Sequence, residues 1–567
     1  MSGSPAAVDT GTVQPQDVQG AAVPGSRLPA TALAGPVASG TAPLGAGGGL
    51  LIEEREFDVL VVGSGAGGGT LAGELAEAGL SVLLLERGTP LPLADQNVAA
   101  IDLFRRRRYH PGEEWIGTDG DPFAPQMVMA PGGNTKIWGG VLERMREREF
   151  CHLPMQEGPG PDWELRYADL EPWYERAETL YRVHGEAGSD ATEPPRSAPY
   201  SLAPRPLEPF QELLRDDLLR QGLHPYRLPL SVGASAEDPS GDAEGFGLER
   251  ARRFPGFELR TGAEVLALHG SASGREVRAV EARIDGQRWL FRAHQVVLAA
   301  GAIASAVILL RSASERHPRG LANGSGQVGR NLMRPQLTAM LQRSAIVHSG
   351  RYGPGLGLTD FHDGDRNVDY ALGVVRGGGG VLQDPLFAES PPVLSLVSRL
   401  LPDPALEWLA DRSVSWWVAS AVRPDPENRV SLRGERVVVN DLPNNREAHD
   451  RLVYRWLAVM QQVERDLATT VVQRAPIYPR GEAPQSVMGF SCGTCRLGSD
   501  PSRSVVNLEG RSHEVANLWI ADGSILPGCP SVGPGLTIVA NALRIAAAIR
   551  VELGLSLIHI SEPTRPY

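Results

Sequence analysis

The stretch FDVLVVGSGAGGGTLAGELAEAGLSVLLLERG, residues 57–88, decides how this chain folds. Residues 57–62 form an apolar run with a single charge, as expected for a parallel strand that is buried on both faces. The glycine-rich residues 63–68 predict a tight turn, and a helix is expected to follow over about residues 68–78. Residues 81–85 predict a second strand. This order of strand, turn, helix and strand is typical of a doubly wound α/β fold.

The turn has the G-x-G-x-x-G spacing of a dinucleotide-binding site. Gly63 permits the turn, Gly65 lets a pyrophosphate approach the backbone, and Gly68 lets helix and strand pack closely. The N–H groups that begin the helix would point at that phosphate. Glu86 ends the second strand, 86 − 63 = 23 residues after Gly63, about where a ribose-binding acid belongs. A glycine-rich loop that binds nothing is the alternative, and the surrounding strand, helix and acid favour the dinucleotide site.

Other segments indicate which dinucleotide is bound. Residues 129–140 read MAPGGNTKIWGG, and three C-terminal segments read GTCRLG (493–498), ADGS (521–524) and PGLTI (534–538). Together with the glycine turn, these segments resemble the glucose–methanol–choline (GMC) family of FAD oxidoreductases. The resemblance covers about residues 57–552 and is closest to bacterial members that have a GGNTK-x-WG loop.

The resemblance implies an FAD-binding, Rossmann-like α/β domain joined to a substrate domain of sheet and helices. It also implies FAD as the cofactor. We expect FAD to be bound non-covalently, because Ile137 stands where some relatives attach the flavin. No metal site is predicted. The residues expected to bind FAD are Gly63, Gly65, Ala66, Gly67, Gly68, Glu86, Arg87, Gly132, Gly133, Asn134, Thr135, Lys136, Trp138, Val265, Ala300, Gly301, Asp522, Gly523, Pro534, Leu536 and Thr537.

The chain of 567 residues is too long for one simple core and suggests two joined domains. We expect residues 1–54 to be a disordered tail, because they are mostly small residues and proline without helix or strand periodicity. The predicted FAD-binding domain combines residues 55–150, 250–332 and 485–554, and the predicted substrate domain combines 151–249 and 333–484. Residues 555–567, LSLIHISEPTRPY, resemble a translated sequencing adapter and are expected to be an artefact.

Composition limits the partners and the location of the protein. A net charge of −12 argues against a nucleic-acid partner. No apolar run approaches the roughly 20 residues that a membrane helix needs. The four cysteines, Cys151, Cys492, Cys495 and Cys529, are too few for a disulfide scaffold and fit a reducing compartment. We therefore expect a cytoplasmic protein, and the resemblance implies that it acts on a small molecule.

Basic residues are almost all arginine. Lys136 is the one lysine and lies in the GGNTK loop, which suggests that a compact ammonium is needed there. The alternative is that it survives by chance on the surface. The run Arg105-Arg106-Arg107-Arg108 is expected to be a solvated helix face rather than a partner site. Trp416 and Trp417 are expected in a core rather than in the wall of a substrate pocket.

The two catalytic positions implied by the resemblance carry unsuitable residues. In the family, a histidine takes the hydroxyl proton as a hydride leaves for flavin N5, and a second His or Asn steadies the alcohol oxygen. The histidine position, three residues before the glycine of the GTC sequence, is Phe490 here. The second position, directly before the proline of PGLTI, is Gly533. The catalytic residues are therefore unknown from the sequence.

Three explanations for the missing pair remain open: a base from elsewhere, flavin chemistry without such a base, or FAD binding without turnover. His362 and His348 are candidate bases in the predicted substrate domain, and His513 is expected to be structural. Cys492 and Cys495 form a C-x-x-C sequence near the expected flavin ring. They suggest a less favoured role as a flavin-linked dithiol reductase, unless both are packing residues.

The favoured function is FAD-dependent oxidation at a CH–OH group of an alcohol or sugar-like substrate. The alternative is a catalytically altered or inactive FAD-binding GMC homologue. The substrate and the electron acceptor are not identified by the sequence.

Overall fold

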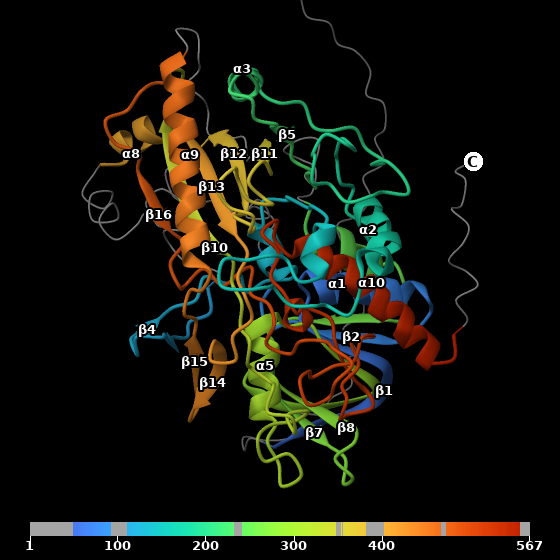
Figure 1. Ribbon diagram of the computed structural model, residues 1–567. Coiled ribbons are helices and arrows are strands. Elements are labelled where there is room, and N and C mark those ends of the chain that lie inside the picture. Colours follow the sequence, from blue (N-terminus) through green and yellow to red (C-terminus); the bar gives the residue numbers. More distant parts are fainter. Residues whose placement is uncertain are drawn as a thin grey trace, which may run out of the picture. The chain divides into compact units, whose positions relative to one another are not determined.

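The computed structural model describes residues 49–91, 110–231, 241–347, 353, 355–380, 402–466 and 472–555 (Figure 1). Residues 1–48, the Arg105–Arg108 run, His348 and residues 556–567 lie outside the described residues, so those predictions stay untested. Within the described ranges, no helix has the length and apolar character needed to cross a bilayer.

The helices are α1 (Ala66–Glu77), α2 (Tyr167–Leu180), α3 (Pro209–Arg220), α4 (Glu249–Ala251), α5 (Ala302–Arg311), α8 (Asp403–Ala410), α9 (Arg446–Asp466) and α10 (Gly535–Glu552), with shorter turns η3 (Gly133–Ile137), η4 (Glu147–Phe150), η5 (Glu244–Leu248) and η6 (Gly523–Ile525). The strands are β1 (Leu51–Val62), β2 (Val82–Leu85), β3 (Trp115–Ile116), β4 (Pro122–Phe123), β5 (Tyr226–Arg227), β6 (Phe257–Arg260), β7 (Ala263–Gly270), β8 (Val277–Ile284), β9 (Gln287–Leu298), β10 (Gln336–Arg343), β11 (Leu356–Leu358), β12 (Val374–Gly380), β13 (Ser413–Ser420), β14 (Arg429–Arg433), β15 (Arg436–Asn440), β16 (Arg480–Glu482) and β17 (Leu518–Ile520).

A seven-stranded sheet contains the predicted strand–turn–helix–strand unit. Its order is β6-β2-β1-β9-β8-β7, and β17 also pairs with β9. The pairs between β1, β2, β6, β9 and β17 are parallel, whereas β8 runs antiparallel to β7 and β9. The run of β-branched and apolar residues at the end of β1 is buried because it lies at the centre of this sheet.

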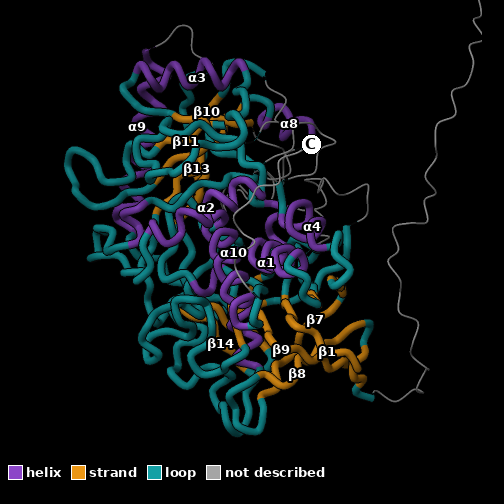
Figure 2. The backbone as a smooth tube through the Cα atoms, turned by 90° about the vertical axis from the view of Figure 1, so that its right-hand side faces the viewer, coloured by secondary structure: helices purple, strands orange, loops and turns teal. Residues whose placement is uncertain are grey.

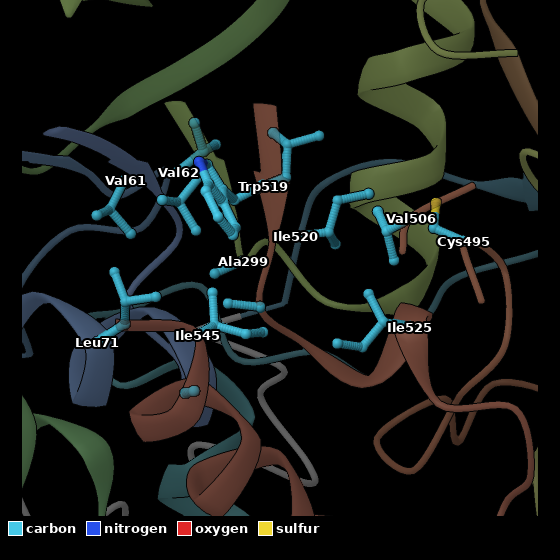
Figure 3. Packing of buried hydrophobic residues seen from close by; sticks show 14 of the residues in the cluster. Val61, Val62, Leu71, Ala299, Cys495, Val506, Trp519, Ile520, Ile525 and Ile545 are labelled. Atoms are coloured by element: carbon cyan, nitrogen blue, oxygen red, sulfur yellow. The ribbon is translucent and has the colours of Figure 1, made fainter. Parts of the chain in front are cut away.

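Helices α1 and α10 pack against each other beside this sheet (Figure 1). Figure 3 shows the buried side chains that meet there, with Val61 of β1, Leu71 of α1, Trp519 of β17 and Ile545 of α10 in one cluster. The last strand and the last helix therefore complete a core that the first βαβ unit begins. Val61 and Ile545 thus belong to one hydrophobic cluster although they lie 484 residues apart in the sequence (545 − 61 = 484).

The beginning of β1 corrects the predicted boundary of the tail. Residues 51–54 were expected to be disordered, but Leu51 and Ile52 pair with Trp289 and Leu290 of β9. Residues 51–56 read LIEERE, without the alternation of apolar and polar residues that marks a strand, so the strand is recognised only through its pairing with β9. The helix after the glycine turn also begins at Ala66, two residues earlier than predicted.

The second sheet has six antiparallel strands in the order β16-β10-β13-β12-β11-β5, and Figure 2 shows it with α3 and α9 nearby. Trp416 is buried in its core, where it lies against Trp456 of α9 with ring centroids 4.7 Å apart. This confirms the core role predicted for Trp416. Apart from residues 51–54, the strands of the first sheet come from the predicted FAD-binding segments and those of the second from the predicted substrate segments, whereas a four-stranded sheet, β14-β15-β3-β4, combines strands from both.

Candidate active site

A long cleft lies at the carboxyl ends of the parallel strands, where α/β proteins bind their ligands. Val62 ends β1, Leu85 ends β2, and Ala299 follows β9, and all three line the cleft. The walls of the cleft also come from the GGNTK loop, from residues 488–491 and from the beginning of α10. Segments that are far apart in the sequence therefore meet around one elongated space.

The glycine turn is shaped by close backbone approaches. Gly63 has φ +94°, in the left-handed region that favours glycine. A Cβ atom at Gly67 would stand 1.6 Å from the carbonyl oxygen of Ala521, and one at Gly68 would stand 2.0 Å from that of Gly63. Gly68 therefore allows the close packing that the sequence predicted.

The space next to Gly65 fits a pyrophosphate. A Cβ atom at Gly65 would meet, within 4 Å, only the carbonyl oxygen of Gly132 at 4.0 Å. Helix α1 begins here without a side-chain cap and without an acidic residue in its first turn, so its first N–H groups face an open cradle. Such a helix start binds phosphate well. The residues present thus fit the dinucleotide that the sequence predicts.

Glu86 lines the cleft at the end of β2. One carboxylate oxygen accepts hydrogen bonds from the Ser64 N–H at 3.0 Å and the Ser64 hydroxyl at 2.5 Å, and the other accepts from the Gly88 N–H at 2.7 Å. Burial raises the pKa of Glu86, and these hydrogen bonds oppose that rise. The carboxylate is held rigidly at the position predicted for the ribose-binding acid.

Asp522 connects the C-terminal segment to the cleft. Its carboxylate accepts hydrogen bonds from the Gly301 N–H at 2.9 Å, the Ser305 hydroxyl at 2.5 Å and the Ser524 N–H at 2.8 Å. Burial raises the pKa of Asp522, and the Ser305 and Ser524 bonds oppose the rise. Asp522 therefore fixes the turn after β9 against the turn before η6.

The GGNTK loop is held in place by its own polar side chains. The Asn134 side-chain oxygen accepts from the Val128 N–H at 2.9 Å, and the Thr135 hydroxyl donates to the Gly132 carbonyl at 2.6 Å. The Gly132 N–H donates to the Ser64 hydroxyl at 3.0 Å, which ties the loop to the glycine turn. The two loops that carry the family signatures therefore form one wall.

Lys136 is a buried ion-pairing residue. Its ammonium lies 2.8 Å from Asp242 and 2.7 Å from Glu244, and its side chain is 6% exposed. The alternative, that Lys136 is a surface lysine retained by chance, is therefore wrong. Lys136 attaches the GGNTK loop to η5, and a compact ammonium suits the narrow space between two carboxylates.

Most of the residues predicted to bind FAD line this cleft. They are Gly63, Gly65, Ala66, Gly67, Glu86, Arg87, Gly133, Asn134, Thr135, Trp138, Val265, Ala300, Gly301, Asp522, Gly523 and Pro534. Five others do not line it: Gly68, Gly132, Lys136, Leu536 and Thr537. Gly68 packs on Gly63, Lys136 pairs with carboxylates, and the Thr537 hydroxyl lies 2.8 Å from the Tyr174 hydroxyl, so these three have other partners.

Several lining residues were missed by the sequence predictions. Glu113 and Trp115, which stand close to Arg87, are examples at one end, and Met488, Ser491 and Ile538 are examples at the other. Glu113, Trp115, Met488 and Ser491 belong to short or irregular segments without a periodic pattern, whereas Ile538 lies in the first turn of α10 beside predicted residues. Only the fold brings them to the cleft.

Phe490 lines the cleft, as do Trp138, Pro534 and Gly535. The Phe490 carbonyl accepts from the Cys492 thiol at 3.6 Å and from the Cys529 thiol at 3.5 Å. Gly533 directly precedes Pro534 and has φ +79°. Phe490 therefore lines the cleft, and Gly533 does not line it but directly precedes residues that do. We refer to the part of the cleft lined by residues 488–491, Pro534, Gly535 and Ile538 as the catalytic end.

His362 does not line the cleft. Its ring is buried, with Nδ1 2.9 Å from Asp363 and Nε2 3.7 Å from Glu149. Glu149 in turn accepts hydrogen bonds from the N–H and the hydroxyl of Ser531, both at 3.1 Å. Burial alone lowers the pKa of His362, but the two carboxylates raise it to about 9. His362 is thus a charged support for the segment before α10 rather than a base in the cleft.

This charged histidine predicts a pH dependence of stability. The pKa of His362 is raised in the folded state, so its contribution is full below the ordinary value near 6.5 and is lost as the pH rises through about 9. We expect the melting temperature of the wild-type protein to fall between these pH values, and that of His362→Gln to be lower at pH 6.5 but to fall less. Parallel pH-dependent slopes in both proteins would show that the histidine does not carry this charge.

The remaining predicted candidates have structural partners. The His513 ring lies 2.9 Å from the Ser504 hydroxyl and 3.1 Å from the Gly498 carbonyl, as expected for a structural histidine. Cys492 and Cys495 are free thiols, fully buried, and neither lines the cleft. Burial raises the pKa of Cys495 strongly, which keeps it protonated. A reactive dithiol needs accessible thiolate, so the structure disfavours that role.

The fold and the cleft define an FAD-dependent oxidoreductase, and comparisons with known proteins agree. A family model described as an FAD binding domain matches residues 58–96, and one described as GMC oxidoreductase matches residues 459–542. The 6'''-hydroxyparomomycin C oxidase of Streptomyces lividus is 31% identical over 537 residues, which cover 88% of this chain and 92% of the relative. The chain belongs to the GMC family of FAD oxidoreductases.

Other relatives and solved structures extend this similarity. The paromamine 6'-oxidase of Streptomyces fradiae is 27% identical, with 88% of this chain and 92% of that protein covered. The fructose dehydrogenase large subunit of Gluconobacter japonicus is 25% identical, with 88% and 99% covered. The crystal structure of pyridoxine 4-oxidase from Mesorbium loti has the same fold, with a TM-score of 0.62 at 20% identity over 87% of this chain and 99% of that one.

Proposed function

We propose that this protein oxidises a CH–OH group of an alcohol or sugar-like substrate, using FAD held non-covalently in the cleft. The observation that carries the proposal is the single cleft that joins the dinucleotide-binding turn to the catalytic end at Phe490 and Pro534. The names of the relatives, which refer to paromamine, fructose and 2-methyl-1,2-propanediol, support an alcohol substrate. We also propose the domain division predicted from the sequence, with the tail shortened to end before Leu51.

Bound FAD would supply a two-electron acceptor for a hydride from the substrate carbon. Within the cleft, we propose that the glycine turn and the start of α1 hold the pyrophosphate and that Glu86 holds a ribose. The start of α10 borders the catalytic end, where its helix dipole favours negative charge. Phe490 and Ile538 line the same end with apolar surface, against which the carbon skeleton of a substrate would pack.

The proton of the substrate hydroxyl needs an acceptor as the hydride leaves. Met488, Gly489, Phe490, Ser491, Gly535 and Ile538 line the catalytic end, and none of these side chains titrates in the neutral range. We propose that the proton passes to water at the open side of the cleft. Oxidation without a positioned base is slower, since such a base typically contributes a factor of about 100 or more.

The test is anaerobic reduction of the flavin by a panel of sugars, polyols and simple alcohols. We expect the oxidised flavin absorption band to bleach slowly with at least one polyhydroxylated alcohol. Bleaching with dithionite but with no alcohol in the panel would instead support the second candidate, an FAD-binding GMC homologue without alcohol turnover. The absence of the expected side chains at Phe490 and Gly533 is the observation that favours this second candidate.

A further inference from the structure

The space left by the missing side chain at Gly533 faces an arginine. A Cβ atom built at Gly533 would have one neighbour within 4 Å, Nη1 of Arg376 at 3.8 Å. Arg376 lies on β12, far away in the sequence, where it pairs with Trp417 of β13 and Gly357 of β11. The second sheet therefore directs a cation toward the position that the family reserves for an uncharged or weakly basic side chain.

The guanidinium of Arg376 is held from one side only. Its Nη2 donates to the Val532 carbonyl and pairs with the Glu143 carboxylate. Glu143 is itself fixed by the Tyr226 hydroxyl at 2.6 Å and by Arg146 at 3.1 Å. One hydrogen bond and one ion pair, both through Nη2, hold the guanidinium, and Nη1 lies toward Gly533.

The other nitrogens of Arg376 have donor capacity left. Within the described part of the chain, Nε has no hydrogen-bond partner and no bond is formed by Nη1. The side chain is 17% exposed, so the guanidinium is neither fully buried nor freely hydrated. A guanidinium is charged at all ordinary pH values and forms its strongest hydrogen bonds to anionic oxygens. A guanidinium N–H group in this state forms a stronger hydrogen bond to an anionic oxygen than to a water molecule.

We propose that Arg376 binds a negatively charged oxygen at the catalytic end, in the space that Gly533 leaves open. This proposal rests on the proposed function and names the group that steadies the substrate oxygen as it becomes alkoxide-like. The site would take a carboxylate oxygen by the same contact. It would disfavour a substrate with an ammonium group beside the reacting carbon, because two cations would then stand close together.

The competing explanation is that Arg376 has only a structural role, in which it connects the Val532 carbonyl to the Glu143 carboxylate. Such a structural role would affect folding, but it would not make the absorption spectrum of the flavin change when anions are added. Acetate is a suitable probe because it presents an oxygen anion of small size, and acetamide is its neutral counterpart.

The experiment is a titration of the FAD-loaded protein with acetate, followed by the visible difference spectrum of the flavin. We expect a saturable change with acetate in the wild-type protein and none with acetamide at the same concentrations. Arg376→Gln should weaken acetate binding at least tenfold, and Arg376→Lys less. Arg480→Gln, which removes an exposed arginine from β16 of the same sheet, should bind acetate as the wild type does.

A second variant keeps the test decisive if Arg376→Gln does not fold. Gly533→Asn leaves Arg376 and its ion pair in place, fits a positive φ, and fills the space in front of Nη1. It should also weaken acetate binding. Unchanged acetate affinity in Arg376→Gln or Gly533→Asn, or an equal response to acetamide, would overturn the proposal.

The titration does not depend on alcohol turnover, so the two proposals fail separately. Bleaching by an alcohol together with no acetate response would remove Arg376 from the site but leave the proposed function intact. Acetate binding that requires Arg376, without bleaching by any alcohol, would keep the oxyanion site and reject alcohol oxidation. If an alcohol bleaches the flavin of the wild-type protein, guanidinium chloride at millimolar concentration should restore part of the reduction rate that Arg376→Ala loses. No such rescue is expected if Arg376 has only a structural role.

Discussion

Gly67→Ala is expected to prevent stable folding, whereas Gly65→Ala is expected to give a folded protein that has lost FAD. The two glycines are neighbours in one turn but have different surroundings. A Cβ atom at Gly67 would stand 1.6 Å from the carbonyl oxygen of Ala521 and 2.8 Å from its carbonyl carbon. The backbone at Ala521 cannot retreat easily, because its N–H donates to the Leu298 carbonyl at 2.8 Å in the sheet. Alanine at this position separates α1 from the C-terminal segment.

Gly65 differs because its Cβ atom would enter open space. Its φ of −67° suits any residue, and the nearest atom outside the turn is the Gly132 carbonyl oxygen at 4.0 Å. The added methyl group would therefore be tolerated by the polypeptide. It would project into the cradle at the start of α1, where the pyrophosphate must approach the backbone. We expect FAD affinity to fall at least tenfold with little change in stability of the protein without FAD.

The measurements are the ratio of flavin to protein absorbance after purification and the thermal unfolding of FAD-free samples. Gly112→Ala is a matched control, because Gly112 is exposed and nothing in the described structure lies within 4 Å of its Cβ position. It should behave as the wild type in both measurements. A Gly67→Ala protein that folds and binds FAD normally would refute the close-approach explanation. A Gly65→Ala protein with full FAD content would refute the assignment of the pyrophosphate cradle.

The sequence was sufficient for the part of the site that one continuous segment forms. The turn from Gly63 to Gly68 and the acid Glu86 are spaced by a single βαβ unit, so their positions follow from local geometry. The long apolar strands and the C-terminal helix were also predictable, because their patterns are dense. The first four residues of β1 were not, since they become a strand only by pairing with β9.

Contacts between distant segments could not be predicted from the sequence. Lys136 was recognised as unusual, but its carboxylate partners Asp242 and Glu244 come from a segment about 100 residues away (242 − 136 = 106). Arg376 has no feature in the sequence that distinguishes it from the other arginines. Its relation to Gly533 depends on how β12 lies against the turn before α10, which no local pattern encodes. The predicted candidate His362 lies instead in an ion pair with Glu149 and Asp363.

The double variant Phe490→His, Gly533→Asn is expected to oxidise alcohols about 100-fold faster than the wild type, if the missing pair limits the reaction. Phe490 is half-buried and lines the cleft. Two thiol hydrogen bonds to its carbonyl hold the backbone at this position, so a histidine introduced there would also line the cleft. Asparagine tolerates the positive φ of Gly533 better than most residues. Its amide would then take over the donor role at the substrate oxygen.

The rate of flavin reduction, measured anaerobically in a stopped-flow instrument against alcohol concentration, decides this prediction. In the double variant the limiting rate should rise with pH through about 6.5, because only the neutral imidazole accepts a proton. The wild type should lack this step. Phe490→Leu, which changes shape without adding a base, is the control and should stay near the wild-type rate. An equal gain in Phe490→Leu would mean that access to the flavin limits the wild-type protein, and no gain in the double variant would mean that its chemistry is not arranged around a base at this position.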